Sequence, residues 1–113
     1  MIDLVLILTT VPVGDRGEAI ARAIVEARLA ACVNLHAPMS SIYHWKGLVE
    51  RDAECQLVIK TTRALVNRVR DLVSSLHPYE LPEWLVIPVE EASPEYDAWI
   101  RAETDGAGPS RTR

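Results

Sequence analysis

Three side chains of this 113-residue chain, Cys32, Cys55 and His77, are chemically suited to bind a transition metal, and Cys32 and His77 are the candidate ligands. Thiolate and imidazole groups are ligands that copper and other transition metals prefer in proteins, so a metal site is one possible role for these side chains. The sequence has no CxxC, HxH or HExxH motif, so the fold or a second subunit would have to bring these ligands together. The alternative is structural: a buried thiol at Cys32, and a His77 ring that packs at a helix end and bonds to a carbonyl group.

Five further side chains are candidates for a polar cleft between subunits: Tyr43, Glu54, Lys60, Tyr79 and Glu83. Glu54 and Lys60 lie on one strand face but six residues, or about 20 Å, apart, so each must meet groups from another strand or subunit. A carboxylate near an ammonium group and phenols can hold a small anion or a hydrated cation. The same charges could instead form a salt-bridge network that fixes how subunits associate.

A long hairpin over residues 41–60 positions most of these side chains. The chain is expected to reverse at Lys46-Gly47, because the second half alternates strictly between apolar and polar residues, which is typical of a sheet with one buried face. A hairpin of this length extends beyond a small domain and leaves edges that need a partner. Trp45, next to the turn, is therefore predicted to anchor the hairpin in a neighbouring subunit.

Composition excludes several classes of protein. The net charge is −4 and no run of Lys or Arg occurs, so a nucleic-acid-binding groove is not expected. The apolar N-terminus has no basic leader and is far shorter than the roughly 20 residues of a membrane helix. A cytoplasmic protein without a membrane partner is predicted. Cys32 and Cys55 fall too far apart along the hairpin to form a disulfide.

The remaining segments complete an α+β fold of the ferredoxin-like type. Hydrophobic periodicity predicts β-α-β-β-α-β and a short C-terminal helix, with a four-stranded antiparallel sheet and the long hairpin between its second and third strands. The segments are strand 2–11, a helix from an Asp15–Glu18 capping box to about residues 29–31, strands 32–45 and 48–61, a helix from a Thr62 cap to residue 76, strand 84–89 and a helix from Ser93-Pro94. The strand 32–45 is expected to be interrupted at 36–39 by a bulge or bend, because Pro38 cannot donate to a sheet ladder. Residues 1–103 form one domain, and 104–113 are expected to be a flexible tail.

The first strand is apolar on both faces, although two helices can cover only one face of the sheet. The other face must be covered by something else. Self-association through sheet faces and hairpin edges meets this need, and a closed ring leaves no edge to propagate.

Four segments resemble the CutA family of divalent-cation tolerance proteins: ARLAACVN (27–34), SIYHWKG (41–47), ECQLVIKTT (54–62) and HPYELPE (77–83). The resemblance covers about residues 4–100. It implies a ferredoxin-like subunit, a homotrimer with hairpins that reach across to neighbours, and a role in tolerance of copper and other divalent metals. Copper sites proposed in the family use a first-strand cysteine and a His-His pair before Pro-Tyr. Here Leu8 and Leu76 take two of those places, and only His77 matches.

The predicted function is therefore that of a trimeric protein of divalent-metal homeostasis that binds or signals and is not an enzyme. The alternative is a PII-like trimeric sensor that binds a small metabolite or nucleotide in clefts between subunits. A phosphate-binding loop with clustered basic residues would favour that alternative, whereas this hairpin is mostly acidic.

Overall fold

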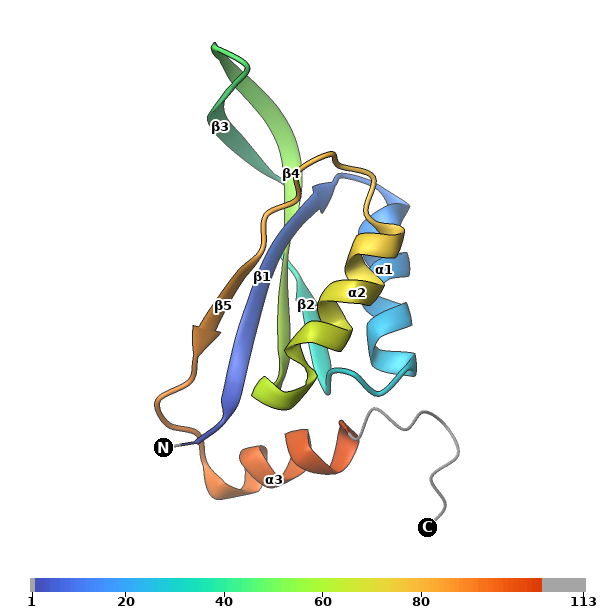
Figure 1. The fold of residues 1–113 in the computed structure, drawn as a ribbon, viewed down its shortest axis with the longest axis vertical. Coiled ribbons are helices and arrows are strands. Elements are labelled where there is room, and N and C mark those ends of the chain that lie inside the picture. Colours follow the sequence, from blue (N-terminus) through green and yellow to red (C-terminus); the bar gives the residue numbers. More distant parts are fainter. Residues whose placement is uncertain (1, 105–113) are drawn as a thin grey trace.

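The computed structural model describes residues 2–104 as a mixed α+β fold with an antiparallel sheet and three helices (Figure 1). The predicted tail lies outside the described residues except for Thr104, which is buried and donates its hydroxyl hydrogen to the Ile100 carbonyl at 2.6 Å. The elements are β1 (Leu4–Pro12), α1 (Asp15–Glu26), β2 (Cys32–Leu35), β3 (Met39–Trp45), β4 (Leu48–Thr62), a 3₁₀ turn (Arg63–Leu65), α2 (Val66–Leu76), β5 (Leu85–Pro88) and α3 (Pro94–Glu103).

The sheet is ordered β2-β4-β1-β5, and every neighbouring pair is antiparallel. β1 is central, with Ile7 opposite Ile59 of β4 and Val86 of β5. The interruption predicted within the strand 32–45 is confirmed: the strand divides at residues 36–38 into β2 and β3, so the sheet has five strands rather than four. Both pieces pair with β4. Pro38 has no amide hydrogen to donate to β4, which explains the break at this point.

The predicted hairpin is confirmed. Trp45 pairs with Leu48, so Lys46 and Gly47 form a two-residue turn, with φ values of 51° and 84°. Two successive residues with positive φ are typical of the tight turns whose twist matches that of the strands. β3 and the far half of β4 extend beyond the rest of the subunit (Figure 1).

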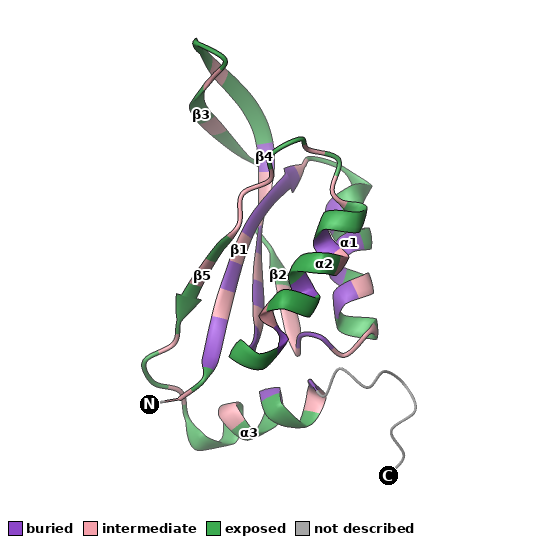
Figure 2. Ribbon diagram, viewed as in Figure 1, coloured by how far each residue is buried: buried purple, intermediate pink, exposed green. Residues whose placement is uncertain are grey.

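The core lies between one face of the sheet and helices α1 and α2. Leu57 and Ile59 on β4 are fully buried, as are Ile20 and Ile24 of α1 and Val69 of α2. Figure 2 shows buried residues along β1 and on the helix sides that face it, whereas β3 and the far half of β4 are largely exposed. The alternation along β4 thus buries its apolar face only where helices cover it.

Both ends of α1 differ from the prediction. The capping box is wrong: Gly14 is the N-cap, no side chain caps this end, and Asp15 is the first helical residue. The helix ends at Glu26 rather than near residue 31, because Arg28 adopts a φ of 60°, the left-handed conformation that commonly ends helices. Thr62 likewise makes no side-chain cap, and the chain enters α2 through a 3₁₀ turn.

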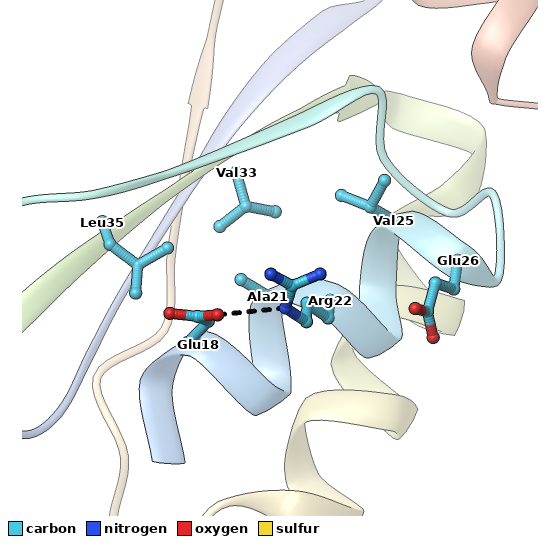
Figure 3. Close-up of a pocket in the computed structure, with 7 residues that line it drawn as sticks. All are labelled: Glu18, Ala21, Arg22, Val25, Glu26, Val33 and Leu35. Atoms are coloured by element: carbon cyan, nitrogen blue, oxygen red, sulfur yellow. Dashed lines mark hydrogen bonds and ion pairs between the residues drawn. The ribbon is translucent and has the colours of Figure 1, made fainter. Parts of the chain in front are cut away.

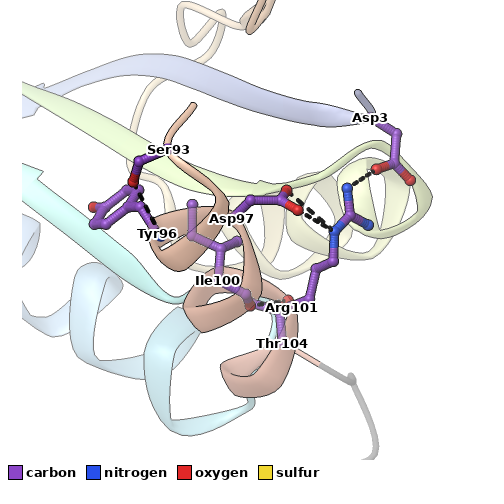
Figure 4. A network of polar contacts seen from close by, with 7 residues as sticks. All are labelled: Asp3, Ser93, Tyr96, Asp97, Ile100, Arg101 and Thr104. Carbon is purple, nitrogen blue, oxygen red and sulfur yellow. Dashed lines mark hydrogen bonds and ion pairs between the residues drawn. The ribbon is translucent and has the colours of Figure 1, made fainter. Parts of the chain in front are cut away.

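The predicted start of α3 is confirmed, because Ser93 Oγ accepts a hydrogen bond from the Tyr96 amide at 3.2 Å and Pro94 is the first helical residue. Arg101 holds this helix against the start of β1 by donating to Asp97 and Asp3 (Figure 4). The Arg101 hydrogen bond lowers the pKa of Asp3.

The second face of the sheet is covered by α3 only near the start of β1. Leu85 on this face is 53 % exposed, and Ile87 is also exposed. Within residues 2–104, no helix has the length and apolar character needed to cross a bilayer.

Candidate functional site

A cluster of phenols and carboxylates lies at the base of the projecting hairpin. Its centre is Glu54, which pairs with Pro12 at the end of β1 and with Met39 at the start of β3. Glu54 as a whole residue is only 8 % exposed. A carboxylate in this position needs hydrogen-bond donors, because an ionised group out of water is otherwise unstable.

Tyr79, from the loop after α2, supplies such a donor. Burial and a hydrogen bond to Glu54 raise the pKa of Tyr79 well above its usual range. The carboxylates of Glu54 and Asp52 also raise this pKa, because they repel the negative charge of a phenolate. Tyr79 therefore stays neutral and donates to Glu54 throughout the physiological pH range.

Tyr43 and Asp52 form a second phenol–carboxylate pair, further out on the hairpin. The Tyr43 hydroxyl donates to Asp52 Oδ2, and this bond raises the pKa of Tyr43 to about 12. The negative charges of Glu54 and Glu50 act in the same direction. The two pairs form one acidic surface across β3 and β4.

His77 lies beside this cluster with both ring nitrogens engaged. Nε2 is 2.7 Å from the Thr10 carbonyl oxygen, and Nδ1 accepts a hydrogen bond from the Tyr79 amide at 3.1 Å. These partners define a neutral ring with its hydrogen on Nε2. The ring also contacts that of Tyr79, with centroids 4.8 Å apart. His77 thus holds the loop in the position that brings Tyr79 to Glu54.

Glu83 closes the other end of the same loop. Its Oε2 accepts a hydrogen bond of 2.7 Å from Gln56 Nε2, and the same amide group also donates to the Thr9 carbonyl at 3.2 Å. The loop between α2 and β5 is therefore attached to the sheet at three points: His77 holds it to β1, and Tyr79 and Glu83 hold it to β4.

Lys60 is not part of this cluster. Its Nζ lies 3.4 Å from the hydroxyl of Tyr96 and 5.8 Å from the centroid of that ring, near α3 at the other end of the sheet. Of the five residues predicted to share a cleft, the subunit brings together Tyr43, Glu54 and Tyr79, places Glu83 beside them through Gln56, and separates Lys60.

The two predicted metal ligands are also separated within the subunit. Cys32 pairs with Lys60, which pairs with Leu6 of β1, whereas His77 bonds to Thr10, four residues or about 13 Å further along β1. Asn34 donates a hydrogen bond to Cys32 Sγ at 3.7 Å. Both cysteines are free thiols, and residues 2–104 contain no group of three or more His, Cys, Asp or Glu side chains arranged to hold a metal.

Trp45 is half-buried beside the turn, with the Lys46 ammonium 5.7 Å from its ring centroid. Apolar residues on the other face of the hairpin are open to solvent: Ile42 is 70 % exposed and Val49 is 67 % exposed. The far part of the hairpin thus presents an apolar surface that the subunit itself does not cover.

Sequence reasoning missed two members of the cluster, Asp52 and Gln56. Both could have been found, because they flank Glu54 at a spacing of two and so share its face of β4. The bond from His77 to the Thr10 carbonyl could not have been found from the sequence, because it depends on the position of the folded loop.

A shallow cavity of about 280 Å³ lies elsewhere, between α1 and the edge strand β2 (Figure 3). Ala21, Val25, Val33 and Leu35 form its apolar lining, and Glu18 and Arg22 pair at its rim at 3.0 Å. None of the predicted site residues lines it. Glu18 and Arg22 thus neutralise each other, and Glu26 is the remaining charged residue of the lining.

The fold and the cluster define a class of protein: a small α+β protein with two helices on one face of an antiparallel sheet and a projecting hairpin with phenols and carboxylates at its base. Residues 5–103 match the family described as CutA1 divalent ion tolerance protein. The chain belongs to this family.

Individual relatives agree with this assignment. The divalent-cation tolerance protein CutA of Thermus thermophilus is 42 % identical over 99 residues, which are 88 % of this chain and 96 % of that protein. Protein CutA of Homo sapiens is 46 % identical over 103 residues, 91 % of this chain, but the match spans only 58 % of the human protein. The crystal structure of CutA from Xylella fastidiosa superposes with a TM-score of 0.88 at 42 % identity, over 91 % of this chain and 99 % of that one.

Proposed function

We propose that this protein acts in divalent-metal tolerance as a homotrimer of ferredoxin-like subunits, by binding or signalling rather than by catalysis. The family match and the description of the Thermus thermophilus relative support the metal-tolerance role. The strand order β2-β4-β1-β5, with β2 and β3 counted as one interrupted strand, supports the ferredoxin-like arrangement.

The observation that carries the proposed assembly is the uncovered apolar surface of the subunit. Ile42, Leu48 and Val49 are exposed on the hairpin, and Leu85 and Ile87 on the second face of the sheet. Exposed apolar areas of this kind mark interaction surfaces. Copies arranged around a closed ring bury such surfaces without leaving an edge for further growth.

The assembly is tested by light scattering of the full chain over a dilution series. We expect a mass of three subunits, because the exposed residues belong to two separate surfaces, each of which can meet a different neighbour. A monodisperse species with the mass of one chain would show that the apolar surfaces do not drive association.

For the metal, we propose Cys32 and His77 as ligands in the assembled protein. They are too far apart in one subunit to share an ion, so different subunits must contribute them. His77 can bind through Nδ1 only by releasing the Tyr79 amide, which makes it the weaker ligand of the two. A thiolate and an imidazole together suit Cu²⁺ better than Mg²⁺ or Ca²⁺.

Calorimetric titration with Cu²⁺ and Zn²⁺ tests these ligands. We expect saturable binding that Cys32→Ser abolishes and His77→Ala weakens about tenfold or more, as loss of one ligand or of its orientation commonly does. Cys55→Ser and His44→Ala are matched controls that remove the same donor types elsewhere. Binding that all four variants retain equally would show that the ligands have been misassigned.

The alternative, a PII-like sensor, has one observation in its favour: a cavity beside Lys60. Lys60 is the one basic side chain among the described residues that line it, whereas a nucleotide's phosphates require several donors or cations. The cavity is therefore better suited to a smaller ligand.

A further inference from the structure

We propose that the cavity beside Lys60 is a binding site for a small organic acid, a molecule with one carboxylate group and a compact apolar body. This inference is independent of the role in metal tolerance, and the residues that carry it are not the proposed metal ligands.

The cavity has a volume of about 320 Å³ and lies between β1, β4, the segment after β5 and the start of α3. Its lining is mostly apolar, with the side chains Leu4, Val5, Leu6, Val89, Ala92 and Ile100. The polar lining residues are few: Lys60, Glu91, Ser93 and Tyr96. Apolar walls with a small number of converging polar groups, at this volume, are typical of sites for small molecules.

Lys60 provides the charge that selects an acid. It is half-buried, and its Nζ lies 3.4 Å from the Tyr96 hydroxyl and 5.8 Å from the centroid of that ring. No carboxylate pairs with Lys60 anywhere in the part of the chain that the structure describes. The hydroxyl group and ring of Tyr96 are uncharged, so the partly desolvated Lys60 ammonium group has no counter-ion among its neighbours. The carboxylate of a ligand would supply one.

The wall formed by α3 is held in place before any ligand arrives. Ser93 caps the helix, and Figure 4 shows Arg101 bound to both Asp97 and Asp3, which ties the helix to the start of β1. At the far end of the helix, Arg28 donates to the Ala102 carbonyl at 2.8 Å. A rigid wall lowers the entropy cost of binding, so even a ligand of few atoms can be held.

Glu91 is the one acidic residue among the lining residues, and it is exposed. In the proposed complex it weakly repels the ligand's carboxylate, so its removal should strengthen binding. If the ligand were instead a cation, removal of Glu91 would weaken binding. Glu91→Gln therefore distinguishes the sign of the ligand's charge.

The experiment uses the full chain in its native oligomeric state, titrated with benzoate and hexanoate by calorimetry or by NMR. We expect saturable binding with about millimolar dissociation constants, as befits ligands of so few atoms. Benzamide, the neutral analogue of benzoate, should bind at least about tenfold more weakly, because it lacks the charge that pairs with Lys60. The absence of saturable binding of both acids would overturn the proposal.

Variants assign the binding to this cavity. Lys60→Met keeps the length of the stem and should weaken benzoate binding about tenfold or more, whereas Tyr96→Phe should weaken it only a few-fold. Lys46→Met is the matched control: Lys46 is the only other lysine in the chain, it lies at the hairpin turn, and its loss should leave binding unchanged.

Light scattering of the Lys60→Met variant completes the test. An oligomer that keeps the wild-type mass and dissociation constant supports the proposal, because the ammonium group then serves the ligand. Dissociation of the Lys60→Met oligomer would overturn it, since the counter-ion of Lys60 would then be a carboxylate of a second copy. Equal binding of benzoate by Lys60→Met and wild type, or weaker binding by Glu91→Gln, would also overturn it.

Discussion

At the scale of single residues, two buried threonine hydroxyl groups differ in whether they form a hydrogen bond. Thr9 and Thr61 are both fully buried on the helix-covered face of the sheet. Thr61 donates to the Leu29 carbonyl at 2.6 Å. Thr9 Oγ1 has no hydrogen-bond partner, and it is the one buried side-chain oxygen or nitrogen atom among the described residues in that situation.

This difference predicts opposite effects for one substitution. Thr9→Val should raise the free energy of unfolding by up to about 1 kcal/mol, because it removes a polar group that is desolvated without compensation. Thr61→Val should lower it by about 1–2 kcal/mol, since the Leu29 carbonyl loses its donor. Urea denaturation measures both. A Thr9→Val variant that is destabilised as much as Thr61→Val would show that the Thr9 hydroxyl has a partner in solution.

The phenols at the base of the hairpin predict a loss of stability in alkali. The pKa of Tyr79 is raised above its ordinary value of 10.0, so the folded state favours the neutral phenol. The stabilisation is complete below pH 10 and is lost as the pH rises through the higher folded-state value. Tyr79→Phe should cost about 1 kcal/mol at neutral pH, through the bond to Glu54, and should reduce the decline above pH 10.

Tyr43→Phe is the comparison for this prediction. Tyr43 is exposed, so its loss should change stability at neutral pH very little. Denaturation curves at pH 7 and at several values above pH 10 measure the effect. An unchanged alkaline decline in the Tyr79→Phe variant would contradict the role given to this bond.

Single-residue chemistry could be predicted from the sequence only in part. Period-2 alternation and the hairpin register place Tyr43 and Glu54 on one face of the sheet, whereas the contact of Tyr79 with Glu54 depends on a loop that has no such pattern. Lys60 was expected about 20 Å from Glu54 on the same strand face, and within the subunit it lies by α3. Its partner Tyr96 belongs to a helix whose position depends on the Asp3–Arg101 pair, a contact between residues 98 positions apart that no local pattern reveals.

At the scale of elements, α1 lies close against β1 at Gly17. A methyl group at this position would lie 2.7 Å from Val11 Cγ2, a contact shorter than real packing allows. The helix comes this near the strand because glycine has no side chain at the point of crossing.

Gly17→Ala is therefore expected to lower the free energy of unfolding by about 1–3 kcal/mol, despite the higher helix propensity of alanine, because the core must shift to admit the methyl group. The double variant Gly17→Ala, Val11→Ala tests this explanation. It recovers the space, so the two changes should be non-additive in urea denaturation. Strictly additive losses would mean that crowding against Val11 is not the cause.

The types and order of the elements followed from the sequence, whereas both ends of α1 did not. Alternation along β4 and the helical stripes of α1 and α2 are long and regular, so each was assigned correctly. Gly14 with a φ of 124° and Arg28 with a φ of 60° decide where α1 starts and stops. Such conformations depend on the packing that surrounds them, and for arginine they have no reliable signal in the sequence.

At the scale of the whole molecule, the proposed assembly gives Trp45 a measurable role. Trp45→Ala should leave the fold of the subunit intact, because this residue lies at the hairpin turn and outside the core. It should raise the dissociation constant of the oligomer about tenfold or more if the ring is buried by a neighbour. Circular dichroism checks the fold, and light scattering over a dilution series measures dissociation.

Lys46→Met provides the control, since it changes the adjacent position without removing the ring. Equal dissociation constants for Trp45→Ala and wild type would rule out an anchoring role for the tryptophan, and the assembly would then depend on the sheet face that carries Leu85.

The far half of β4 has a consequence for the motions of the protein. Residues 48–53 pair with β3 alone, whereas each of residues 54–62 pairs with β1. A two-stranded ribbon is only marginally stable in water, so its backbone amides should take up deuterium within seconds in an isolated chain, while those beneath α1 and α2 resist exchange for much longer. Slow deuterium uptake along the ribbon would therefore indicate that neighbouring chains cover it.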